Sequence, residues 1–161
     1  MTLAEFNSVP RYRAEAELIE ACGSRAWVRA IAGRRPFQGF DRLLRAASEV
    51  WWSLDGPDWR EAFAAHPKIG ERKAISPVSA QEQSGMRGAA HETIMSLDQA
   101  NREYLAKFGH IFIVCASGKS AGEMLAIVRS RLPNSPEQEI RVAAGEQQKI
   151  TRLRLERLFT P

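Results

Sequence analysis

His66 and Arg154 are the first side chains whose types and surroundings suggest chemistry. His66 begins the run His66–Gly70, in which a proline and a glycine shape a loop. An unperturbed imidazole has a pKa of about 6.5 and exchanges protons near neutral pH, although a structural role is commoner for a loop histidine. Arg154 shares a helical face with apolar residues, so it either extends to solvent or meets a buried anion. The residues alone leave both interpretations open.

Glu82 is a further candidate, and its surroundings favour a structural role. The run Ser79–Glu82 has the Ser-x-x-Glu spacing of a capping box, in which serine caps a helix and glutamate reaches back to the chain. Gln83 follows directly. From this spacing alone, we expect Glu82 to cap a helix rather than to take part in catalysis.

Motifs that hold nucleotides or metals fail here at a required position. Gly118-Lys119-Ser120 resembles the end of a phosphate-binding loop, but isoleucine stands at position 113, where that loop requires glycine. His91-Glu92 opens like a zinc-protease motif, but Met95 replaces its second histidine. The three histidines show no metal-ligand spacing with either cysteine. We therefore expect neither a metal site nor a cofactor.

Helices are expected to form most of the chain and to position the candidate residues, because apolar side chains recur every three or four positions. The helices that this spacing predicts cover residues 11–21, 40–52, 59–65 and 79–108. Pro67 disfavours helix at His66, so residues 66–77 are expected to form a loop. Gly109 is suited to end the helix before it, because glycine readily adopts the left-handed conformation.

Two further helices are predicted from their N-terminal caps. Ser120 and Glu123 have the spacing of a capping box, and Ser135 precedes a proline at the first helical position. The helices that these caps open cover residues 121–132 and 136–159. The run Ile111–Ala116 resembles a strand, but it has no partner strand in the sequence. We expect it to be a buried connection or helical turn in an all-α fold.

The composition indicates one globular domain over residues 1–161. Hydrophobic residues make up 44% of the chain and charged residues 26%, which is ordinary for a folded domain. No apolar run approaches the roughly 18 residues of a membrane span, and the first residues do not resemble a secretory signal. We therefore expect a cytoplasmic protein in which Cys22 and Cys115 are reduced core thiols.

The net charge of +4 and the pI of about 9.4 raise an alternative function. A basic helical protein can serve as a binding module for nucleic acid or for a protein partner. Here, however, arginines and lysines alternate with acidic residues, and no window holds five like charges. We therefore expect these charges to form solvated helix faces and the protein to bind neither nucleic acid nor a membrane.

Five runs of sequence, each weak alone, are specific because they occur together and in order. They are HPKIG at 66–70, EQSG at 82–85, NREYLAKFG at 101–109, FIVCASGKS at 112–120 and EQQKITRLRL at 146–155. With these runs the chain resembles the 2-oxo-4-hydroxy-4-carboxy-5-ureidoimidazoline (OHCU) decarboxylases of urate breakdown. The resemblance implies a compact helical bundle that is dimeric, a carboxy-lyase that needs no cofactor and makes (S)-allantoin.

The resemblance also implies roles for the candidate residues. His66 resembles the catalytic proton donor and Glu82 its catalytic partner, which reverses the structural interpretation of Glu82. The positions that resemble substrate-binding residues are Pro67, Ser79, Gln83, Ile113, Val114, Cys115, Ala116 and Arg154. The backbone of residues 113–116 is expected to bind the substrate ring, and Arg154 its acidic or ureido group. His110 stands where the resemblance leads us to expect an apolar or aromatic residue.

Overall fold

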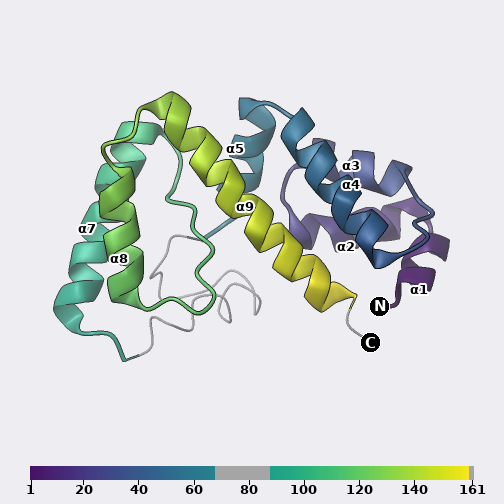
Figure 1. Cartoon of the computed structure of the whole chain (residues 1–161), viewed down its shortest axis with the longest axis horizontal. Coiled ribbons are helices and arrows are strands. Elements are labelled where there is room, and N and C mark those ends of the chain that lie inside the picture. Colours follow the sequence, from purple (N-terminus) through teal and green to yellow (C-terminus); the bar gives the residue numbers. More distant parts are fainter. Residues whose placement is uncertain (68–87, 160–161) are drawn as a thin grey trace. The chain divides into compact units, whose positions relative to one another are not determined.

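The computed structural model of the protein describes residues 1–67 and 88–159, which form helices and connections without a strand (Figure 1). The predicted all-α fold is therefore confirmed. The helices are α1 (Leu3–Ser8), α2 (Arg11–Ala21), α3 (Arg25–Gly33), α4 (Phe40–Ser53), α5 (Gly56–Ala64), α7 (His91–Phe108), α8 (Ala121–Arg131) and α9 (Pro136–Leu158). Within the described residues, no helix has the length and apolar character needed to cross a membrane.

Contacts between residues group the chain into two compact units, and each is described by itself. Unit 1 contains Met1–Ala62 and Gln147–Pro161, and unit 2 contains Phe63–Glu146. Helices α5 and α9 therefore contribute residues to both units. This grouping does not test the prediction of a single domain, which stays a prediction.

The core of unit 1 is built on α2, α3 and α4, which pack in sequence order. Trp27 of α3 is fully buried, and its indole nitrogen donates to the carbonyl of Ala47 on α4 at 3.0 Å. Leu18, Ile31 and Leu43 are equally inaccessible to solvent. A buried indole N–H costs free energy unless it has a partner, so this hydrogen bond lets tryptophan fill the core.

Two helices of unit 1 were not predicted, although each carries a local signal. Thr2 and Glu5 form a capping box at the start of α1, and Phe6 on this short helix is fully buried. Ser24 caps α3, accepting from the N–H of Trp27. In both cases a serine or threonine at the N-cap marks the start of the helix.

Two predicted helix starts are wrong. Helix α5 begins at Gly56, three residues earlier than predicted. The long helix predicted over 79–108 does not continue through residues 88–90, because α7 begins at His91. Gly88 has a φ of 72° and Ala90 is extended, and both conformations interrupt a right-handed helix. Residues 79–87 of that prediction lie outside the described part of the chain.

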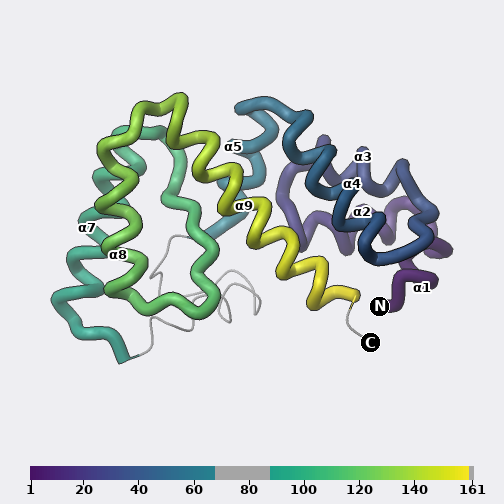
Figure 2. Tube along the Cα trace, viewed as in Figure 1, coloured from purple at the N-terminus to yellow at the C-terminus, as the bar shows by residue number. Residues whose placement is uncertain are grey.

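Unit 2 is centred on α7 and α8, which lie side by side in Figure 2. The segment that joins them runs back along both helices. Side chains from all three contribute to one apolar cluster, whose buried members include Leu97, Tyr104, Phe112, Met124 and Val128. Residues 112–116 are buried and belong to neither helix nor strand, which confirms the predicted buried connection.

The predicted caps at Ser120, Ser135 and Gly109 are confirmed. Ser120 and Glu123 form the capping box of α8. Ser135 and Gln138 form the corresponding reciprocal pair before α9, with backbone-to-side-chain distances of 3.1 and 3.2 Å. Gly109 ends α7 with a φ of 77°, and its N–H donates to the carbonyl of Leu105 at 2.9 Å.

A pair of glycine substitutions in unit 2 tests the importance of this last cap. Gly109→Ala is expected to lower the free energy of unfolding by about 1 kcal/mol, because alanine rarely adopts a positive φ. Gly145→Ala, inside α9, is expected to raise it by about 0.5–1 kcal/mol. An added Cβ meets no described atom within 4 Å at either position, so a steric clash cannot explain a difference in stability between the two variants. Urea denaturation measures both changes, and two equal values would contradict the conformational explanation.

Candidate active site

The connection between α7 and α8 is held in place by charged side chains. The carbonyl of Ile113 accepts from Nη1 of Arg131 at 2.6 Å. The N–H of Cys115 donates to the Glu146 carboxylate at 3.2 Å, and the Cys115 carbonyl accepts from Nζ of Lys119 at 2.7 Å. Because the connection is neither helix nor strand, these side chains replace the hydrogen bonds that secondary structure normally supplies.

Other backbone groups of the same connection face no protein partner in the described part of the chain. They are the N–H groups of Ile113, Val114 and Ala116 and the carbonyl of Val114. All three residues are at most 4% exposed. Buried backbone groups are nearly always paired in native proteins, because leaving them unpaired costs free energy. These donors and this acceptor are therefore suited to bind a polar ligand.

His66 and Pro67 belong to the same unit as the connection. His66 lies just beyond α5, where its N–H donates to the carbonyl of Phe63 at 3.1 Å. It is half-buried, and Pro67 is buried. Helix α5 ends before Pro67, as the sequence predicted, because the proline ring disfavours helical backbone in the preceding residue. The predicted proton donor and the predicted ring-binding backbone therefore belong to the same unit.

His110 takes the place of an aromatic core residue. Its ring lies 5.0 Å from that of Phe63, 5.5 Å from Tyr104 and 6.3 Å from Phe108, measured between centroids. Nδ1 lies 3.0 Å from the carbonyl of Ile111, so this nitrogen carries a proton and donates it. Because the carbonyl of Phe63 also accepts from the N–H of His66, the aromatic cluster is linked to His66 through Phe63.

A buried ion pair beside the connection was not predicted. The Arg131 and Glu139 side chains are 7% and 0% exposed, and Nε of Arg131 donates to both carboxylate oxygens. The guanidinium also lies 4.7 Å from the ring centre of Phe112. Nη2 donates to the hydroxyl of Tyr104 at 3.4 Å, and burial raises the pKa of that hydroxyl above its usual range.

The sequence contains one signal for this pair. The buried positions of α8 are Ala121, Met124, Val128 and Arg131. Their spacing of three or four residues continues the apolar stripe of the helix onto the arginine. The same reasoning that singled out Arg154 therefore also applies to Arg131.

Arg154 lies in unit 1, on the second half of α9. It is half-buried, and Nη1 donates to the carbonyl of Glu20 at 3.3 Å. Glu20 is in the last turn of α2, where carbonyls have no partner within the helix. The guanidinium thus contributes to capping α2. Ser79, Glu82 and Gln83 lie outside the described residues, so their predicted roles stay predictions.

Both cysteines are free and buried, as predicted. Burial raises the pKa of the Cys22 thiol from 9.0 to about 11, and hydrogen bonds with Ser24 and Thr151 and the charge of Arg154 oppose this rise. At pH 7 the thiol is therefore fully protonated. A protonated thiol in the core is a poor nucleophile.

The pKa of Cys22 leads to a prediction for alkaline stability. Between pH 9 and pH 11 the unfolded chain ionises this thiol while the folded chain keeps its proton. The free energy of unfolding should therefore fall, by about 2 kcal/mol from this group. Urea denaturation at pH 8 and pH 11 should show a smaller loss in Cys22→Ala than in the wild type. Equal losses would mean that the thiol ionises as easily in the folded state.

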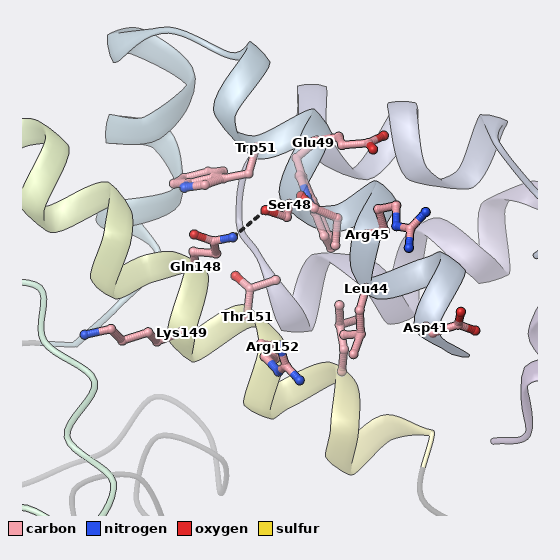
Figure 3. A pocket seen from close by; sticks show the side chains of 13 residues that line it. Asp41, Leu44, Arg45, Ser48, Glu49, Trp51, Gln148, Lys149, Thr151 and Arg152 are labelled. Atoms are coloured by element: carbon pink, nitrogen blue, oxygen red, sulfur yellow. Dashed lines mark hydrogen bonds between the residues drawn. The ribbon is translucent and has the colours of Figure 1, made fainter. Parts of the chain in front are cut away.

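Unit 1 also contains a pocket of about 620 Å³ between α4 and the second half of α9 (Figure 3). Trp51 and Leu155 contribute apolar surface, and Arg45 also lines the pocket. Gln148 donates to the hydroxyl of Ser48 at 2.5 Å and so links the two helices. Among the described residues, none of the predicted site residues lines this pocket. Within residues 1–67 and 88–159, no group of three or more acidic, histidine or cysteine residues is arranged to hold a metal ion.

The described residues form an all-helical fold. It has a histidine just beyond α5 and a buried connection whose backbone groups are available to a ligand, as a small enzyme requires. A sequence model of the family described as OHCU decarboxylase matches residues 7–156. The chain therefore belongs to the OHCU decarboxylase family, as the five sequence runs predicted.

Individual relatives support this assignment. The chain is 26% identical over 167 residues to an OHCU decarboxylase of Halalkalicoccus jeotgali, covering all of this chain and 93% of that protein. It is 33% identical over 147 residues to the uric acid degradation bifunctional protein TTL of Arabidopsis thaliana. That match covers 86% of this chain and 45% of the Arabidopsis protein, so the chain spans less than half of this relative.

The fold is also that of a solved OHCU decarboxylase. A crystal structure of OHCU decarboxylase in the presence of (S)-allantoin superposes with a TM-score of 0.81 at 35% sequence identity. The superposition covers 90% of this chain and 98% of that one. A crystal structure of (S)-allantoin synthase, 18% identical, shares the fold with a TM-score of 0.74.

Proposed function

We propose that this protein decarboxylates OHCU to (S)-allantoin in urate degradation, without a cofactor and as a cytoplasmic homodimer. Membership of the family and the likeness to an enzyme solved with (S)-allantoin support the reaction. The observation that carries the proposal is the buried connection, whose N–H groups at Ile113, Val114 and Ala116 are available to a polar ring.

The chemistry of the substrate explains why side chains suffice. OHCU carries its carboxylate on C4, next to a C=N bond of its own ring. When the bond from C4 to the carboxylate breaks, its electron pair flows into this imine. The imine nitrogen then takes up a proton, the C4 hydroxyl loses its proton as it becomes a carbonyl, and C5 gains a proton. The ring itself accepts the electrons, so the enzyme has to orient the substrate and move protons.

Three side chains and the backbone of the connection have tasks in this sequence of steps. His66 delivers the proton to C5, since a positioned imidazole is a common proton donor in catalysis near neutral pH. Glu82 accepts a hydrogen bond from His66 and stabilises the imidazolium. Arg154 offers a planar pair of donors to carboxylate or ureido oxygens. The backbone N–H groups of the connection stabilise negative charge that develops on the ring.

The configuration of the product tests the function. OHCU also decays without an enzyme, and a proton from water reaches either face of C5, so that reaction yields racemic allantoin. The enzyme should consume freshly generated OHCU faster and yield optically active (S)-allantoin, as circular dichroism of the product reports. A difference of about 2.7 kcal/mol between the two protonation barriers suffices for 100:1 selectivity. Faster loss of substrate with racemic product would contradict the role of His66.

A titration with duplex DNA at physiological salt tests the alternative, a basic binding module. The interleaved charges predict no binding beyond the weak, nonspecific attraction of any basic protein. Tight DNA binding by a chain that leaves OHCU decay unchanged would replace the proposed function.

A further inference from the structure

In the peptide group between Ile113 and Val114, the carbonyl has a hydrogen-bond partner and the N–H is available to a ligand. Its carbonyl accepts the 2.6 Å hydrogen bond from Nη1 of Arg131. The peptide is trans, since the one cis bond among the described residues is Arg35–Pro36. In a planar trans peptide the C=O and N–H point in opposite directions. Arg131 on the carbonyl side therefore directs the N–H of Val114 away from itself.

The guanidinium that holds this carbonyl is itself held rigidly. Glu139 engages Nε through both carboxylate oxygens, and the Phe112 ring packs against the guanidinium carbon at 4.7 Å. Nη2 reaches the Tyr104 hydroxyl. These contacts come from α7, from the connection and from the start of α9, so they fix the guanidinium from several directions. A guanidinium held in one position also holds the peptide to which it donates in one orientation.

Stability alone does not account for a pair of charges at this place. Both side chains are at least 93% buried, and removing charges from water costs several kcal/mol per ion. Apolar residues of similar volume often stabilise a core equally well or better. What they cannot supply is the hydrogen bond from Arg131 to the carbonyl of Ile113.

We propose that Arg131, oriented by Glu139, is a positioning residue that aims the N–H of Val114 at the substrate ring. The inference rests on the proposed function, because it concerns the backbone predicted to bind the ring. Arg131 acts through the peptide and does not touch the substrate. Its loss should therefore change how firmly and in which orientation the ring is held, and so which face of C5 receives the proton.

The double variant Arg131→Met/Glu139→Met tests the proposal, because it removes both charges together and leaves neither one unpaired in the core. We expect it to fold cooperatively with a melting temperature below that of the wild type, because the buried carbonyl of Ile113 loses its partner. We expect KM to rise at least tenfold and the enantiomeric excess of allantoin to fall. Enzyme concentrations are adjusted so that the catalysed rate exceeds spontaneous decay by the same factor in every sample. Arg129→Met, an exposed arginine of the same helix, is the control and should match the wild type.

A purely structural role would reduce the active fraction, which lowers the maximal rate but leaves KM and the enantiomeric excess unchanged. A folded double variant with wild-type KM and enantiomeric excess would overturn the proposal. If the double variant does not melt cooperatively, Glu139→Gln is measured instead. This variant keeps an acceptor for Nε of Arg131 and removes the charge, so we expect KM to rise less than in the double variant. An unchanged KM would overturn the proposal. Absence of optically active product with the wild type would instead refute the proposed function.

Discussion

His66→Ala is expected to lower kcat for OHCU decarboxylation at least 100-fold while the helical circular dichroism and the melting temperature stay close to those of the wild type. General acid catalysis by a positioned side chain contributes roughly 10²- to 10⁴-fold, which sets the size of the loss. Folding should be preserved, because His66 is half-buried just beyond the end of α5 and does not belong to the buried core. Initial rates with freshly prepared substrate measure the effect.

His91→Ala provides the matched control for this experiment. His91 is exposed at the first position of α7. His91→Ala therefore makes the same chemical change as His66→Ala, in the same unit. This variant should keep the wild-type kcat. If His66→Ala retained more than about a tenth of the wild-type rate, His66 would not be the proton donor.

Arg154→Lys is expected to raise KM for OHCU about tenfold with little change in kcat. Lysine keeps the positive charge but loses the planar pair of donors that matches a carboxylate or a ureido oxygen pair. A rise in KM at constant kcat means that binding of the ground state and of the transition state weakened equally. A tenfold change corresponds to about 1.4 kcal/mol.

The environment of Arg154 in unit 1 supplies the controls. Lysine retains a donor for the carbonyl of Glu20, so the capping of α2 need not be lost. Arg152→Lys changes a neighbouring arginine that is 66% exposed and paired with Glu156, and it should leave KM unchanged. If Arg154→Lys left the kinetics unaltered but lowered the melting temperature, the capping of α2 would be the whole role of this residue.

Local interactions explain which parts of the fold could be predicted from sequence. The capping box of Ser120 and the left-handed Gly109 each depend on residues within four positions. The helix from Arg11 to Ala21 was predicted with its observed ends, and α9 with its last residue one position away. The periodicity of apolar residues predicted an all-α fold for the same reason, since it requires only a short window of sequence. The candidate site was located by resemblance, because spacing alone favoured structural roles for His66 and Glu82.

The sequence by itself therefore determined most of the helices, the caps at Ser120, Ser135 and Gly109, the buried connection and the family, whereas the tertiary structure decided how side chains distant in sequence combine. No spacing rule joins Arg131 to Glu139 and Ile113, because these residues lie on different elements that meet only after folding. His110 shows the same dependence: its sequence position does not reveal that it packs among three aromatic rings. A side chain's partner across elements is set by packing, and packing depends on every element that surrounds it.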